Sequence, residues 1–349
     1  MGSVKDLFVF KSPTETEFGE GTFEFSDRYS VFDYGEMPDL IPGKGQALAI
    51  MSAVSFERLS ELTDIGSHYK GIINRDGDVV SVYDLKAPTN AILVDLVRVI
   101  KPTFENGDYD YSEYASMILQ NCLIPLEVIY RNNLPQGSSV FKRLDSGLLT
   151  YQELGLSEYP VFGQKLPNSF FELTTKLEKT DRSISFNEAA NMIGLFDSEM
   201  YEIRNVLKNV ERVITTLAAE AGMDNDDGKI ELAFAPNKSI IVVDVFGTPD
   251  ECRFTYKGVQ LSKEILRRYY SRTPWYDEVR RAKDRAKTEK VEDWQQFCSK
   301  PEPLPKDLLE LVSILYMAMA NAFVKKSLFN VPALPLVVDE YVKVWNKYQ

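Results

Sequence analysis

The sequence predicts an α+β protein, in which strands pair as hairpins and helices follow them. Two strongly apolar strand segments flank a turn near the middle of the chain, within residues 229–247. Further hairpin patterns lie in the first hundred residues, and residues 259–349 show mainly helical patterns. Strands joined by short turns pair antiparallel, because a parallel pair needs a long crossover. We therefore expect antiparallel sheets.

Composition restricts the class of protein. The chain has 349 residues, 44% of them hydrophobic, and a formal net charge of −12. The length suggests about two domains. The acidity disfavours a nucleic-acid partner, which needs clustered Lys and Arg. Three distant cysteines form no disulfide pattern and favour a cytoplasmic location. We find no signal peptide and no run of about 18 apolar residues, so we expect no membrane span.

A single histidine, His68, excludes several kinds of site. A multi-histidine zinc site cannot be assembled, and neither can a catalytic triad built on another histidine. His68 lies in a polar stretch, where we expect an ordinary surface residue. If the protein is an enzyme, carboxylates, lysines, arginines and metal ions are expected to carry its chemistry.

The central hairpin contains the first candidate site. If its turn is centred on Asn237 and Lys238, Glu231 falls directly opposite Asp244. Side chains paired in this way lie about 4.5–5.5 Å apart at Cβ, so like charges repel unless they share a proton or a cation. Mg²⁺ held by two carboxylates and substrate phosphates is common at ATP sites. Two alternatives need no metal. A register that differs by one residue would separate the two carboxylates, or Lys229 and other cations would neutralise them.

A polar loop is the second candidate site. Gly137, Ser138 and Ser139 offer backbone N–H groups and two hydroxyls, and Arg131 precedes them. Such a loop suits a phosphate monoester. A polar turn with solvated charges is the alternative.

Charged residues of both signs gather in the irregular segment 26–48, which contains Asp27, Arg28, Asp33 and Lys44. Binding residues often lie on such loops. The IPGKG sequence in this segment lacks the GxxxxGK[ST] spacing, which excludes a P-loop.

Local patterns predict further elements. Residues 45–63 and 200–217 have apolar residues at helical spacing, and Gly222 suits the end of the second helix. Residues 123–132 are rich in strand formers, but Pro125 restricts this strand to an edge, an end or a bulge.

Several motifs, taken in order, resemble those of the SAICAR synthetase family, the phosphoribosylaminoimidazole-succinocarboxamide synthases of purine biosynthesis. GSVKDL is similar to the family's GKxKxxY strand, SDRYSVFD to SDRxSxxD, and IPGKG to IPxKG. IPLEVIYRN with GSSVFKRL resembles VPxEVVxRN…GS, and TTKLEKTDRSIS resembles TxKxexxDxPIS. DGKIELAF and DVFGTPDECRF are similar to VDxKxEFG and DExxTPDxxRF. The motifs run along most of the chain, and their order makes a chance match implausible.

The resemblance implies an ATP-dependent ligase with a two-lobed α+β fold, an ATP cleft between the lobes and C-terminal helices. ATP would phosphorylate the imidazole carboxylate of CAIR, and the amine of L-aspartate would displace phosphate to give SAICAR. This chemistry relies on positioning and charge neutralisation and needs no histidine. The expected division is an N-terminal lobe of residues 1–122, a central lobe of 123–258 and a helical segment of 259–349. A homodimer is a family expectation.

The same resemblance implies roles for individual residues. Lys229 and Arg253 are the catalytic candidates, and Lys229 would neutralise charge near the reacting carboxylate. The candidates for ATP binding are Lys5, Lys176, Glu231 and Asp244. The two carboxylates among them would hold Mg²⁺. The set for the ribose phosphate is Arg131, Ser138, Ser139 and Arg253. The remaining substrate set is Asp27, Arg28, Asp33, Lys44 and Asp250.

The chain departs from the family pattern at several positions. Ser3 replaces the first Lys of GKxK, Val245 replaces the Glu after Asp244, and Ser183 replaces a Pro. These differences leave open a related ligase or small-molecule kinase that acts on another carboxylate. An acidic interaction protein that keeps the fold without the chemistry is the alternative outside the enzymes.

Overall fold

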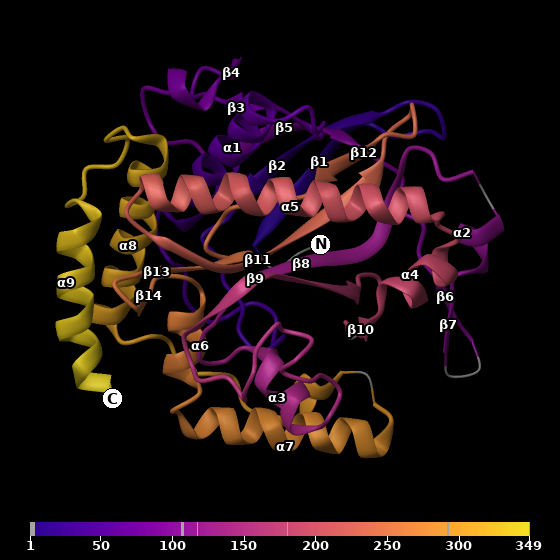
Figure 1. Cartoon of the computed structure of the whole chain (residues 1–349). Helices are drawn as coiled ribbons and strands as arrows, with labels where there is room; N and C mark the ends of the chain where they lie inside the picture. Colours follow the sequence, from indigo (N-terminus) through magenta and orange to yellow (C-terminus); the bar gives the residue numbers. More distant parts are fainter. Residues whose placement is uncertain (1–3, 106–107, 117, 180, 292, 349) are drawn as a thin grey trace.

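Two antiparallel sheets form the centre of the protein, and helices cover them (Figure 1). The computed structural model describes residues 4–105, 108–116, 118–179, 181–291 and 293–348, so Ser3 lies outside the described residues. The arrangement confirms the predicted α+β class.

The first sheet has the strand order β1-β2-β5-β3-β4. Every neighbouring pair in it is antiparallel, as its hairpin turns favour. The edge strand β1 exposes four consecutive apolar residues, from Leu7 to Phe10. The bounds are β1 Lys5–Lys11, β2 Gly19–Phe25, β3 Tyr69–Ile73, β4 Val79–Val80 and β5 Ala91–Leu96.

The second sheet has the order β10-β9-β8-β11-β13-β14, and β12 pairs with β11. β8 lies inside this sheet although it contains Pro125. The pairing of β8 with β11 shifts between Glu231 and Ala233, so the proline lies at a bulge, one of the three predicted places. The bounds are β8 Cys122–Leu134, β9 Gln164–Thr175, β10 Ser183–Ile184, β11 Asp224–Phe234, β12 Ile240–Val243, β13 Cys252–Tyr256 and β14 Val259–Gln260. A separate hairpin joins β6 Thr103–Glu105 and β7 Asp108–Asp110.

The helices cover the sheets from several sides (Figure 1). α1 packs against the first sheet, α5 and α8, whereas α5 lies along β8 and β11. Gly222 follows α5 with a φ of 78°, as predicted. The α-helices are α1 Lys44–Leu62, α2 Ser112–Ser116, α3 Ser139–Asp145, α4 Phe186–Ile193, α5 Asp197–Glu220, α6 Glu264–Tyr270, α7 Pro274–Glu289, α8 Lys306–Val324 and α9 Leu334–Trp345. The 3-10 turns are η1 Val82–Asp84, η2 Trp294–Phe297 and η3 Asn346–Tyr348.

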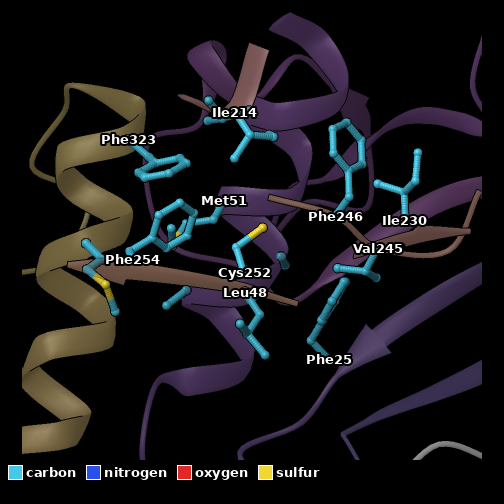
Figure 2. Packing of buried hydrophobic residues seen from close by; sticks show 14 of the residues in the cluster. Phe25, Leu48, Met51, Ile214, Ile230, Val245, Phe246, Cys252, Phe254 and Phe323 are labelled. Carbon is cyan, nitrogen blue, oxygen red and sulfur yellow. The ribbon is translucent and has the colours of Figure 1, made fainter. Parts of the chain in front are cut away.

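The main core joins elements from all parts of the chain. Figure 2 shows Leu48 of α1, Ile214 of α5, Phe254 of β13 and Phe323 of α8 in one apolar cluster. The strands of the first sheet end at Leu96, and those of the second begin at Cys122. The three-part division of the chain, with its first boundary at residue 122, stays a prediction.

α8 is a long apolar helix. Within the described residues it is long and apolar enough to cross a membrane, with a mean hydropathy of 1.5 over its most apolar window. Asp307 and Glu310 interrupt it, so it is not the continuous run of about 18 apolar residues that the sequence lacks. However, 61% of that window is buried, and α8 packs between α1 and α9. These contacts are those of a core helix.

The register of the central hairpin differs from the prediction by one residue. Glu231 pairs with Val243 and not with Asp244. The turn ends with Lys238 in the left-handed conformation, with a φ of 68°, and this extra turn residue shifts the pairing. A one-residue shift turns every side chain of a strand to the opposite face. Both faces of this hairpin are apolar, and Ile241 enters a second small cluster, so hydrophobicity alone does not select the register.

Candidate active site

Lysines and carboxylates alternate beside the middle of β11. Lys176 Nζ lies 2.5 Å from Glu231 and 3.5 Å from Glu127. Lys229 Nζ lies 2.6 Å from Glu127 and 3.3 Å from Glu251. The carboxylate directly opposite Glu231 is therefore Glu127 on β8, and Lys176 lies between the two like charges.

Asp244 reaches this cluster from the end of β12. The strand ends at Val243, and Asp244 takes a left-handed φ of 62°. Its Oδ1 accepts a hydrogen bond of 2.5 Å from Lys5 of β1. Burial opposes ionisation of Asp244, but Lys5 and Lys176 outweigh it, so its pKa lies below the ordinary value. Burial and the charge of Asp244 raise the pKa of Glu231, which indicates that the two carboxylates lie close together.

His68 lies inside the protein, so the prediction of a surface residue is wrong. Its side chain packs against the rings of Phe23 and Phe56. Nε2 lies 3.0 Å from the backbone oxygen of Asp244, and because a carbonyl only accepts, the ring nitrogen donates. Burial lowers the pKa of His68 to about 4. A neutral imidazole therefore supports the backbone of Asp244.

We expect His68 to make stability depend on pH. The folded protein keeps the ring neutral down to about pH 4, whereas the unfolded chain binds a proton near pH 6.5. The unfolded state binds more protons between these values, so stability falls as the pH falls from about 6.5 to about 4, by about 3 kcal/mol. Urea unfolding of the wild type and His68→Gln in EDTA, from pH 4 to 7, measures this contribution.

The His68→Gln side chain keeps an N–H donor for the backbone oxygen of Asp244 and does not titrate between about pH 4 and 7. Asp226, whose pKa burial raises to about 6, acts in the opposite direction in both proteins, so the difference between them isolates His68. Equal pH slopes in the two proteins would contradict a neutral buried imidazole.

The predicted phosphate loop is held by internal partners. Ser138 caps the short helix α3, and Ser139 Oγ accepts a 3.1 Å hydrogen bond from Arg131. Arg131 is buried, pairs with Glu172 and lies 3.1 Å from Asp227. Its charge is thus already balanced. The role of Arg131 in phosphate binding stays a prediction.

Two cavities adjoin this network. The smaller, of about 160 Å³, is lined by Arg131, Lys229, Asp250 and Arg253, among others. The larger, of about 680 Å³, is lined by Ser138 and Arg253 and by arginines of α6 and the loop after it. Because the cavities share Arg253, Glu264 and Arg267, they adjoin. The structure therefore brings Lys229, Arg253, Asp250 and the serine loop to one region.

Lys44 and Asp250 form a buried ion pair of 2.8 Å, with 0% and 4% of their side chains exposed. Tyr316 of α8 donates a 2.8 Å hydrogen bond to the second oxygen of Asp250. Burial opposes ionisation of Asp250, but Lys44 and, next, Lys263 outweigh it, so the pKa of Asp250 is lowered. Both residues thus hold α1, α8 and the 249–251 turn together. Their contact with substrate stays a prediction.

The other candidates of segment 26–48 lie in two places. Asp27 accepts hydrogen bonds from backbone N–H groups at the start of α1 and lines a separate cavity of about 400 Å³. Arg28 pairs at 2.7 Å with Asp6, which lines the same cavity. Asp33 pairs with Lys283 of α7 at 3.0 Å and lines a cavity beside that helix. The structure therefore places Asp27 and Arg28 near one cavity and Asp33 near another.

Sequence reasoning missed several charged partners. Glu127 stands in the IPLEVIYRN motif, and Asp227 precedes the glycine of DGKIELAF, so the resemblance held a signal for both. Glu172 had no local signal, because it meets Arg131 only through the pairing of β9 with β8.

Within the described part of the chain, no group of three or more His, Cys, Asp or Glu side chains could hold a metal ion. Glu231 and Asp244 nevertheless offer carboxylate oxygens, which suit Mg²⁺. Two carboxylates fit such an ion when substrate phosphates and water supply the other ligands. Lys5 and Lys176 balance the two negative charges in this arrangement.

Lysines and arginines line the cavities beside paired carboxylates, a combination that is typical of the class of proteins that bind phosphorylated, anionic molecules. The chain belongs to the SAICAR synthetase family, whose family model matches residues 1–282. This match confirms the resemblance in the sequence motifs.

Named relatives agree with the family. A phosphoribosylaminoimidazole-succinocarboxamide synthase of Thermoplasma acidophilum is 33% identical over 306 residues, 85% of this chain and 90% of the relative. An Archaeoglobus fulgidus protein, provisionally given the same name, is 42% identical over 344 residues, 99% of both chains.

Solved structures show the same fold. The SAICAR synthase of Saccharomyces cerevisiae, complexed with SAICAR, has a TM-score of 0.61 and 21% identity, and the match covers 93% of this chain and 94% of that one. A type-2 SAICAR synthetase in complex with ADP has a TM-score of 0.54 and 22% identity, with 87% and 99% covered.

Proposed function

We propose that this protein is an ATP-dependent ligase that joins L-aspartate to CAIR, with SAICAR, ADP and phosphate as products. Family membership and the names of the archaeal relatives support the proposal. The observation that carries it is the alternation of lysines and carboxylates from Lys5 to Glu251, which leads to the substrate cavities. A cytoplasmic location and a homodimer belong to the same proposal and rest on the family alone.

The proposed reaction has two steps. A carboxylate oxygen of CAIR attacks the γ-phosphorus of ATP, and ADP leaves. The amine of L-aspartate then attacks the acyl carbon, the C–O bond to phosphate breaks, and the amine loses a proton to water. Catalysis of both steps depends on positioning and on stabilising negative charge.

The residues near β11 suit these steps. Lys5 and Lys176 would contact the ATP phosphates, and Glu231 with Asp244 would hold Mg²⁺, which neutralises phosphate charge when it is bound. Burial disfavours the charge of Lys229, but Glu251 and Glu127 outweigh it and raise its pKa. Lys229 therefore keeps a positive charge for the reacting carboxylate and does not serve as a base.

Omission of substrates tests the proposal. Purified protein receives Mg·ATP, CAIR and L-aspartate, and ADP and amide product are measured with each component omitted in turn. We expect both products only when all three substrates are present. ADP release without aspartate would favour a kinase. The absence of any Mg²⁺-dependent thermal shift with ATP would favour a protein without this chemistry.

We expect kcat/KM for CAIR to fall as ionic strength rises, while kcat changes little. The larger cavity and the one beside α7 share Lys142 and Arg267, and together they are lined by eight cationic and three acidic side chains. In a protein of net charge −12, this local positive field attracts anionic substrates. Initial rates between low and high salt measure the slope.

Arg280→Gln/Arg281→Gln removes two charges from this surface and should flatten the slope. Lys287→Gln/Lys290→Gln is the matched control, because both lysines are exposed at the end of α7 and line neither cavity. The same slope for both double variants would show that α7 does not attract the substrate.

A further inference from the structure

Lys263 differs from the other charged residues of the smaller cavity. Five cationic and four acidic side chains line this cavity. Arg131 and Arg253 pair with Asp227, Arg267 pairs with Glu264, and Lys229 pairs with Glu251. Within the described residues, no ion pair or hydrogen bond to Lys263 Nζ is found. Among the described residues that line this cavity, Lys263 is therefore the cation that forms no ion pair.

The surroundings of Lys263 explain why its charge stays unbalanced. Its backbone N–H donates to Pro249 at 3.2 Å, which places the residue beside the 249–251 turn. The acidic neighbour Asp250 already accepts from Lys44 and Tyr316. Burial lowers the pKa of the Lys263 ammonium, and the attraction of Asp250 and Glu251 does not offset burial and the repulsion of Arg267 and Lys44. A poorly solvated, unpaired charge is unfavourable, so the arrangement suits an anionic ligand.

The size of the cavity limits this ligand. About 160 Å³ is small beside the roughly 300–1,000 Å³ of pockets that enclose drug-sized molecules. The adjoining cavity of about 680 Å³ has room for a ribonucleotide. Arg253, a candidate for the ribose phosphate, lines both cavities, and Arg131 lines the smaller one. We therefore expect the ribonucleotide in the larger cavity, with its phosphate near Arg253 where the cavities meet, and the smaller, second substrate beside Lys263.

We propose that Lys263 binds a carboxylate of L-aspartate and that the smaller cavity is the site of the amine donor. The inference rests on the proposed function. L-Aspartate carries two carboxylates and one ammonium group, which match Lys263, the half-exposed Arg267 and the carboxylate of Glu251. Because Glu251 also pairs with Lys229, an ammonium held by Glu251 lies next to the lysine that faces the acyl phosphate.

Lys263→Gln tests the proposal through separate KM values. We expect the KM for L-aspartate to rise about 10- to 100-fold, because a charge-assisted contact is lost, while the KM values for CAIR and ATP stay within about twofold. Lys263→Arg should recover much of the loss. Lys306→Gln is the control, since Lys306 is an exposed residue at the start of α8, remote from the cavity lining.

Alternative substrates give a second measurement that needs no variant to fold. Succinate should compete with L-aspartate, because it keeps both carboxylates, and L-asparagine should be a poor amine donor. In Lys263→Gln or Lys263→Met, the preference for aspartate over asparagine should shrink.

Three results separate the possible failures. An unchanged KM for aspartate, or wild-type enzyme that succinate does not inhibit, would overturn the proposal. A rise in the KM for CAIR alone would assign Lys263 to the ribonucleotide and also overturn it. Wild-type protein that makes no amide with L-aspartate would instead refute the proposed function.

Discussion

Asp244→Asn is expected to lower kcat/KM by about 100-fold or more while the fold is retained. The substitution removes the negative charge that would hold Mg²⁺ and that pairs with Lys5 at 2.5 Å. Asn tolerates the left-handed conformation better than most residues, so the φ of 62° at this position is no obstacle. Steady-state rates over a Mg²⁺ titration measure the effect, and thermal unfolding checks the fold.

Glu340→Gln is the control for Asp244→Asn. Glu340 is an exposed carboxylate on α9 that pairs with Lys343 at 3.1 Å and lines none of the cavities described above, so its loss should change kcat/KM by less than about twofold. Full activity of Asp244→Asn with an unchanged Mg²⁺ requirement would refute the metal assignment. A higher Mg²⁺ requirement with partial activity would support it.

Lys44→Met is expected to destabilise the protein by about 3–5 kcal/mol. The substitution leaves the Asp250 carboxylate buried, and within the described residues Tyr316 is then its remaining hydrogen-bond donor. The cost of an unpaired buried charge exceeds the gain from a more apolar side chain. Equilibrium urea unfolding at pH 7 measures the difference in the free energy of unfolding.

Two further variants define the cause of this effect. Lys44→Met/Asp250→Asn should recover part of the stability, because a neutral amide costs less to bury than a carboxylate. Lys70→Met should cost less than about 1 kcal/mol, since Lys70 is an exposed residue that pairs with Glu20 and Asp95 across the face of the first sheet. A loss of stability below about 1 kcal/mol for Lys44→Met would show that the pair is not needed.

Local patterns were sufficient for much of the fold. The helix at 45–63 and the long helix that Gly222 ends follow from side-chain spacing and backbone chemistry, which also limited Pro125 to three places, one of them the bulge that the structure has. These features depend on a few neighbouring residues, so the sequence contains their causes. The predicted register of the central hairpin was wrong. Both faces of this hairpin are apolar, so only contacts with other elements decide which face each side chain takes.

In the candidate site too, local sequence predicted some features and distant contacts decided others. Lys176, Lys229, Glu231 and Asp244 came from motifs, and the structure joins them in one electrostatic cluster. The prediction that His68 lies on the surface was wrong, because its polar local sequence does not reveal that Phe23 and Phe56 pack against the ring. Burial of one residue depends on partners from distant elements, which no local window contains.

The sequence by itself determined the class of fold, the family and the residue types that handle charge, since these are properties of composition, spacing and motifs. Only the tertiary structure decided which charges are already paired. Arg131 is balanced by Glu172 and Asp227, whereas Lys263 has no partner within the described residues. The physical reason is that an ion pair needs a separation of a few ångströms, and strand pairing sets that separation between residues far apart in the chain.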